Sequence, residues 1–234
     1  MNSKLVEQIN REIPTTQSAS FAESVRVHLD YLEPKLVGFD KLAKKLLHFI
    51  KQPQQFCDFL TEAHWALSLL CLGVIAEYEP LGESGPDIRV QHSDSIVDFH
   101  CKRLRNDLNT AEKLENYNDK LIKYGNVQND TISIFERITS EQPQRIDISI
   151  PQIVAYWSDS ERVEEHEFKE AIDSIQTATV EGRFHWISGV IYKVRIFKHF
   201  EHWYNPYSSV RVPGELKEIL QRLQPWPTIA KSTL

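Results

Sequence analysis

The sequence predicts an α/β fold in which helices flank a central mixed β-sheet and a helical segment precedes it. Up to about residue 72, apolar residues recur every three or four positions, which is the spacing of amphipathic helices. From Gly73 onward, short segments alternate apolar and polar residues as strands do, with Gly- and Pro-containing turns between them. Helical spacing returns later in the chain, so we expect strands and helices to mix around one sheet.

The first part of the chain is expected to be helical. Apolar stripes run through residues 21–32 and 40–50, and the strongest one runs through residues 56–71 after a proline. We therefore divide the chain into an N-terminal helical segment, residues 1–52, and an α/β core, residues 53–234. We expect the segment to pack on the core within one compact domain.

The core begins with a strand and a hairpin. Residues 74–78 read as a strand, and residues 88–90 and 96–101 pair as a hairpin around a turn at 92–94. The later expected strands span residues 146–150, 153–157 and 186–197, and the later expected helices span residues 107–123, 164–178 and 212–223.

The composition is that of an ordinary globular protein. Apolar residues make up 41% and charged residues 26% of the 234 positions, which excludes wholesale disorder. The three cysteines show no CxxC spacing, so we expect reduced thiols. The start is not signal-like and no apolar run approaches the ~20 residues of a membrane span, so we expect a cytoplasmic protein without membrane contact. A net charge of −6 disfavours polyanion binding overall but permits a local basic surface.

Polar residues at the predicted hairpin carry the candidate chemistry. Asp87 directly follows a Gly–Pro turn. On the next strand Asp98, His100 and Lys102 share one face, because strand side chains alternate between faces. An acid, a histidine and a lysine in this arrangement are unusual for a strand that only packs. They indicate a metal and phosphate site.

The order of these residues resembles a family of metal-dependent nucleases. Glu62 on a helix, Pro86–Asp87 at the start of a strand, and His100-Cys101-Lys102 on the next strand resemble the PD-(D/E)XK superfamily over roughly residues 56–105. The resemblance implies a restriction-endonuclease-like core and a catalytic set of Glu62, Asp87, His100 and Lys102. It also implies a magnesium or manganese ion at the scissile phosphate, with the lysine helping to activate water.

One position departs from the family pattern, because His100 stands where the family has an acid. Histidine is a poor ligand for magnesium but an acceptable one for manganese or zinc. The ligand set that we expect is Glu62, Asp87, Asp98 and His100, with Asp98 replacing the missing carboxylate. Glu77 on the neighbouring strand is a further candidate for that role.

Three functions remain open at this point. The first is a metal-dependent nuclease acting on nucleic acid, DNA before RNA, whose backbone is held by Arg103, Arg105 and Lys123. Because many nucleases of this kind work in pairs, the resemblance also suggests a homodimer. The second is a catalytically inactive binding or assembly module of the same fold that lost its acid at His100. The third is an unrelated α/β interaction protein in which the motif is accidental.

Overall fold

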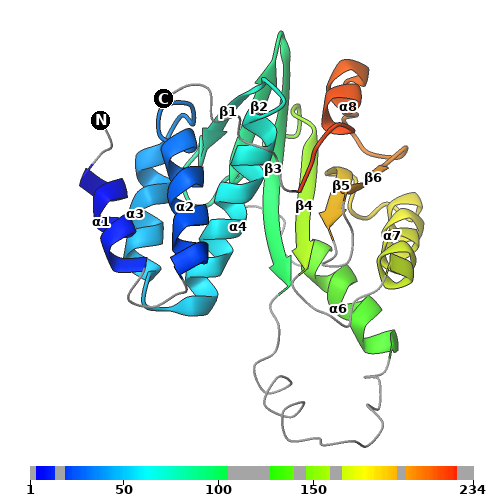
Figure 1. Cartoon of the computed structure of the whole chain (residues 1–234). Helices are drawn as coiled ribbons and strands as arrows, with labels where there is room; N and C mark the ends of the chain where they lie inside the picture. The colour runs from blue at the N-terminus through cyan, green and yellow to red at the C-terminus, as the bar shows by residue number, and fades with distance from the viewer. Residues whose placement is uncertain are drawn as a thin grey trace, which may run out of the picture.

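A computed structural model describes residues 4–13, 19–104, 127–139, 146–158, 165–193 and 199–225. These residues form N-terminal helices followed by a mixed sheet with helices packed against it (Figure 1). The helices are α1 (Lys4–Glu12), α2 (Ala19–Leu32), α3 (Phe39–Phe49), α4 (Pro53–Leu70), α6 (Val127–Thr139), α7 (Glu165–Val180) and α8 (Gly214–Leu220). The strands are β1 (Ile75–Tyr78), β2 (Ile88–His92), β3 (Ser95–Leu104), β4 (Gln152–Ser158), β5 (Ile187–Lys193) and β6 (Glu201–Tyr204).

The six strands lie in chain order across the sheet. Strands β1, β2 and β3 form an antiparallel meander, β4 and β5 continue parallel to β3, and β6 returns antiparallel to β5. Strand β3 pairs with β2 only through Phe99 but pairs with β4 as far as Leu104. The second half of β3 therefore extends past the point where β2 begins.

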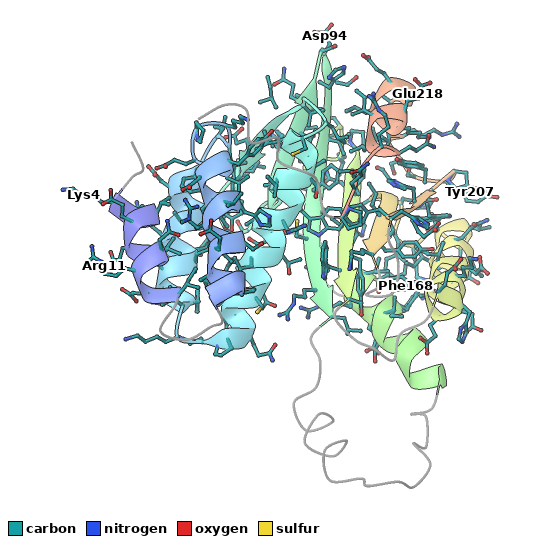
Figure 2. All side chains as sticks on the ribbon, in the orientation of Figure 1. Lys4, Arg11, Asp94, Phe168, Tyr207 and Glu218 are labelled. Atoms are coloured by element: carbon teal, nitrogen blue, oxygen red, sulfur yellow. The ribbon has the colours of Figure 1, made fainter. Side chains whose placement is uncertain are left out.

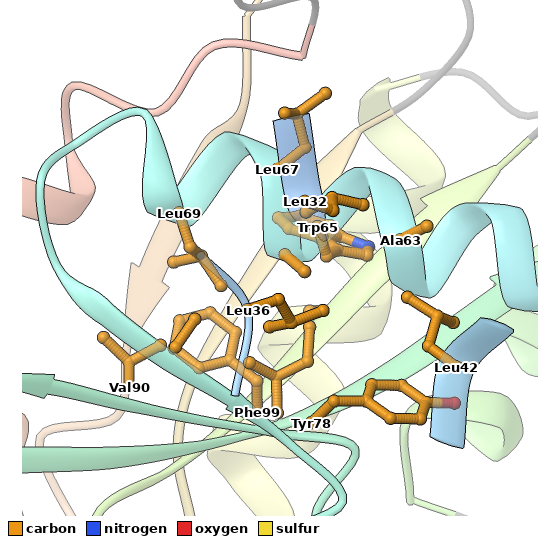
Figure 3. Packing of buried hydrophobic residues seen from close by; sticks show 14 of the residues in the cluster. Leu32, Leu36, Leu42, Ala63, Trp65, Leu67, Leu69, Tyr78, Val90 and Phe99 are labelled. Carbon is orange, nitrogen blue, oxygen red and sulfur yellow. The ribbon is translucent and has the colours of Figure 1, made fainter. Parts of the chain in front are cut away.

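Helices cover the two faces of the sheet with separate apolar clusters. One cluster joins α1, α2, α3 and α4 to the sheet through residues such as Leu42, Trp65, Val90 and Phe99 (Figure 3). The other joins α6 and α7 to β4 and β5 around Phe168. Because the N-terminal helices share one cluster with α4 and the sheet, their apolar faces are buried without a separate core.

The hairpin of β2 and β3 agrees with the expected alternation. Val97 and Phe99 are buried in the cluster under α4, whereas Asp98 between them faces the other way and pairs with Arg89. The turn lies at Ser93 and Asp94, with Ser93 in the left-handed region at φ 51°, and Asp94 lies at the hairpin tip (Figure 2). A two-residue turn of this kind matches the twist of the flanking strands.

Two sequence-based expectations differ from the structure. Residues 146–150 form no strand, because Asp147 accepts hydrogen bonds from the amide and hydroxyl of Ser149 at 2.9 and 2.6 Å and closes a turn that leaves Ile148 73% exposed. The pattern also did not indicate helix α6. The helix expected at residues 107–123 lies outside the described residues, as does the end of the strand expected at residues 186–197.

No helix in the described ranges combines the length and the apolar character needed to cross a bilayer.

Candidate functional site

Two carboxylates meet where β2 begins. Glu62 comes from the middle of α4, and Asp87 follows the turn that leads into β2. The phenol of Tyr78 donates a hydrogen bond of 2.5 Å to Glu62 Oε2, and the backbone N–H of Cys101 donates one of 2.6 Å to Asp87 Oδ2. We call Glu62 and Asp87 the acid pair. Each carboxylate is held by one donor from a neighbouring strand.

Burial raises the pKa of both acids, and a neighbouring carboxylate adds to the effect in each case, Asp87 for Glu62 and Glu79 for Asp87. Burial raises the pKa of Glu62 to about 8, and the charge of Asp87 adds to this effect while the Tyr78 hydrogen bond opposes it. Burial also raises the pKa of Asp87 to about 6, against the Cys101 N–H bond and the positive charge of Lys102. Near neutral pH, Glu62 is therefore mostly protonated and Asp87 mostly ionised.

Two lysines complete the electrostatics of the acid pair. Lys102 on β3 and Lys45 on α3 both lower the pKa of Asp87 by their positive charge. Lys45 also forms an ion pair with Glu79, whose carboxylate is buried. The site thus contains three acids and two lysines drawn from α3, α4, β3 and the segment between β1 and β2.

Glu79 anchors the turn that presents Asp87. It adopts φ 46°, which is unusual for a residue with a side chain. Its carbonyl accepts a bond of 2.8 Å from Lys41 Nζ, and its N–H donates to the Asp87 carbonyl at 2.8 Å. These contacts hold Glu79 in its unusual backbone conformation. The bond from Glu79 to Asp87 joins the two ends of the turn and so fixes the aspartate at the end of the sheet.

The Cys101 thiol does not add an ionised ligand or nucleophile. Burial, and then the carboxylates of Asp87 and Glu62, hold the pKa of this thiol well above its usual range. Cys101 acts on the acid pair through its backbone N–H instead.

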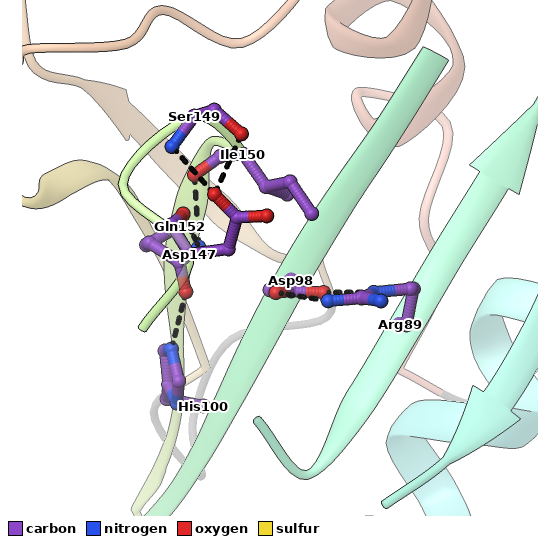
Figure 4. A network of polar contacts seen from close by, with 7 residues as sticks. All are labelled: Arg89, Asp98, His100, Asp147, Ser149, Ile150 and Gln152. Carbon is purple, nitrogen blue, oxygen red and sulfur yellow. Dashed lines mark hydrogen bonds and ion pairs between the residues drawn. The ribbon is translucent and has the colours of Figure 1, made fainter. Parts of the chain in front are cut away.

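Asp98 and His100 belong to a different network on the other face of β3 (Figure 4). Arg89 binds Asp98 through two hydrogen bonds of 2.7 and 2.9 Å, and the Asp98 side chain is 1% exposed. His100 Nε2 donates to Gln152 Oε1 at 2.7 Å, because the Gln152 amide nitrogen donates to the Ile150 carbonyl at 2.8 Å. Burial lowers the pKa of His100, so the imidazole stays neutral.

The structure therefore divides the predicted metal ligands into two groups. Glu62 and Asp87 lie close enough for the charge of Asp87 to raise the pKa of Glu62, whereas Asp98 and His100 are engaged with Arg89 and Gln152. Within the described parts of the chain, no three His, Cys, Asp or Glu side chains are grouped so that they could hold a metal ion. Asp98 pairs with Arg89 rather than turning toward the acid pair.

Of the three residues predicted to hold the nucleic-acid backbone, the structure describes only Arg103. Arg103 turns toward α4, where Nη1 donates to Asp58 Oδ1 at 3.1 Å and to the Gln54 carbonyl at 3.3 Å, leaving its side chain 10% exposed. Arg105 and Lys123 lie outside the described residues.

Sequence reasoning did not single out Lys45 or Glu79 for the site. Glu79 lies close to the turn before Asp87 and could have been noticed, but no local pattern connects Lys45 with it.

The donor chemistry of the acid pair suits a hard divalent cation. Two carboxylates supply the oxygen ligands that magnesium and manganese prefer. Magnesium commonly keeps several waters and binds through one or two protein carboxylates together with substrate phosphate, so a third protein ligand is not required. A cation would also favour the ionised form of both acids, whose pKa is raised by burial and by a neighbouring carboxylate.

Comparisons of the chain with protein-family models, with curated proteins and with solved structures find no match. The functional argument therefore depends on the residues and contacts described above.

Proposed function

We propose that this protein is a metal-dependent nuclease-like enzyme acting on phosphodiester bonds, with DNA as the substrate and a restriction-endonuclease-like core. The observation that carries the proposal is the half-buried acid pair at the start of β2, where the charge of Lys102 acts on Asp87. The element order supports the fold assignment: helix α4, the antiparallel meander of β1, β2 and β3, and then the parallel strand β4. A fold alone does not define an activity, so the proposal depends on the site.

Glu62 and Asp87 would hold the magnesium or manganese ion, which when bound polarises the phosphodiester and lowers the pKa of water. The chain's own groups prepare this arrangement. The Cys101 N–H orients Asp87, Tyr78 orients Glu62, and Lys102 places a positive charge where negative charge develops on the phosphate.

Cleavage of a labelled DNA duplex, measured with and without manganese or magnesium, tests this proposal. We expect cleavage that depends on the metal and is lost in Asp87→Asn, while Asp94→Asn at the exposed hairpin tip behaves as the wild type. Circular dichroism checks that Asp87→Asn remains folded. Cleavage that persists in folded Asp87→Asn would contradict the assigned site.

A second candidate is the catalytically inactive binding or assembly module. The observation that favours it is the contact between His100 and Gln152, which commits the residue at the family's acid position to a buried network away from the acid pair. In that case the wild type would bind DNA with the same affinity in EDTA as in manganese and would cleave nothing. Metal-dependent cleavage by the wild type would exclude it.

A further inference from the structure

A row of lysines follows α3. Lys41, Lys44 and Lys45 lie on one side of this helix, and Lys51, seven residues after Lys44, continues the row just past the helix end. The opposite side of α3 is apolar and is buried in the cluster under α4. Lys41, Lys44 and Lys51 are exposed. We call these four residues the α3 lysines.

The α3 lysines begin at the acid pair. Lys45 is half-buried at 22% exposure and is paired with Glu79, whose N–H donates to the Asp87 carbonyl at 2.8 Å. Lys41 holds the Glu79 carbonyl from the neighbouring turn of the helix. From there the row leads outward to Lys44 and Lys51, neither of which forms an ion pair with another described residue.

This row differs from the other basic residues near the site. The guanidinium of Arg103 is engaged by Asp58 and Gln54, and that of Arg89 by Asp98. A phosphate contact by either arginine would first require a buried or half-buried hydrogen-bonded pair to break, which is costly. Lys44 and Lys51 can meet a phosphate without losing such a contact. A local positive surface of this kind can bind a polyanion although the whole chain is acidic.

We propose that the sugar-phosphate backbone of DNA lies along the α3 lysines and enters the acid pair beside Lys45. The N-terminal helical segment is then part of the substrate-binding surface rather than only a support for the core. The inference depends on the proposed action on DNA, and it adds which element contacts the substrate outside the reacting phosphate. Phosphate contacts by lysine supply sequence-independent affinity that falls with salt.

The double variant Lys44→Ala/Lys51→Ala tests this surface, because both side chains are exposed and neither holds the Glu79 turn. Binding of a fluorescein-labelled DNA duplex is measured by anisotropy in EDTA, at salt concentrations between about 50 and 200 mM. The control is Lys169→Ala/Arg183→Ala, which removes the same charge near α7 on the opposite face of the sheet. Circular dichroism checks the fold of both.

The expected result is a shallower salt dependence in the α3 variant and not in the control. Loss of two phosphate contacts reduces the slope of log K against log salt by about 1.8. Between those two salt concentrations, the wild type should therefore lose roughly tenfold more affinity than the α3 variant. Equal slopes for the two double variants would overturn the proposal, as would wild-type protein that does not bind the duplex.

The outcome for this surface is separable from the outcome for the nuclease. If the α3 variant binds more weakly but the wild type cleaves no DNA with any metal, the surface stands and the nuclease proposal fails. If the wild type cleaves with manganese and the α3 variant has an unchanged KM and salt slope, the nuclease proposal stands and the surface is refuted.

Discussion

Replacing Glu62 with glutamine should stabilise the metal-free protein at neutral and alkaline pH. In the folded protein the pKa of this carboxyl is raised to about 8 from an ordinary value of 4.5. Between these two values the folded state keeps a proton that the unfolded state has released. Stability therefore falls as the pH rises through this window, and the penalty is absent below the lower value and complete above the upper one.

The size of the effect follows from the same shift. A displacement of about 3.5 pKa units corresponds to an upper limit of roughly 5 kcal/mol above pH 8, and about 3 kcal/mol at pH 7. Glutamine resembles the protonated acid in shape, so it keeps the folded-state packing and removes the ionisation of the unfolded state. We expect Glu62→Gln to gain about 3 kcal/mol of unfolding free energy near pH 7 and nothing near pH 4.

Urea denaturation followed by tryptophan fluorescence, in EDTA and across this pH range, measures the difference. Glu218→Gln on α8 is the control, because Glu218 is exposed (Figure 2). It should differ from the wild type by less than about 0.5 kcal/mol at every pH. A Glu62→Gln protein no more stable than the wild type near pH 7 would refute the conclusion that burial and Asp87 destabilise the charged carboxylate.

Three further predictions concern the partners of these residues. Tyr78→Phe removes the hydrogen-bond donor to Glu62 and should lower the unfolding free energy by about 1 kcal/mol at low pH. It should also raise the pKa of Glu62 further, which would shift the pH–stability curve to higher pH. Arg89→Ala leaves buried Asp98 without its partner and should lower the unfolding free energy by about 3–5 kcal/mol. The double variant Arg89→Ala/Asp98→Ala should recover part of this loss, because no unpaired carboxylate remains. Equal losses in the two variants would contradict the pairing of Arg89 with Asp98. Arg103→Ala should lower thermal stability without weakening DNA binding, because its guanidinium contacts α4. A loss of affinity with a shallower salt slope in a variant that remains folded would contradict that assignment.

The parts of the fold with strong local patterns were predictable from the sequence. Helix α4 and the hairpin of β2 and β3 follow from apolar spacing that matches one period over many residues. The error at residues 146–150 has a local cause: Asp147 and Ser149 use side-chain hydrogen bonds to form a turn that the alternation of apolar residues does not reveal.

The site was predictable only in part. Strand alternation predicted that Asp98, His100 and Lys102 share one face. Asp98 and His100 lie together in one network, whereas the charge of Lys102 acts on Asp87 as well as on His100. The partners Arg89 and Gln152 depend on register and on a parallel strand about fifty residues away. The contribution of Lys45 depends on how α3 packs against α4 and β1, which no short spacing encodes. Contacts between residues that only tertiary packing brings together could therefore not be predicted from the sequence.

The central claim is that the acid pair binds a divalent cation, and proton release on binding tests it most directly. Near pH 7 Glu62 carries a proton that it must give up to become a ligand. Calorimetric titration with manganese, in two buffers of different ionisation enthalpy, should show saturable binding with release of about one proton. Both signals should be absent in Asp87→Asn, and proton release should be absent in Glu62→Gln. Absence of saturable binding by the wild type, or binding without proton release that is unchanged in both variants, would contradict the assignment.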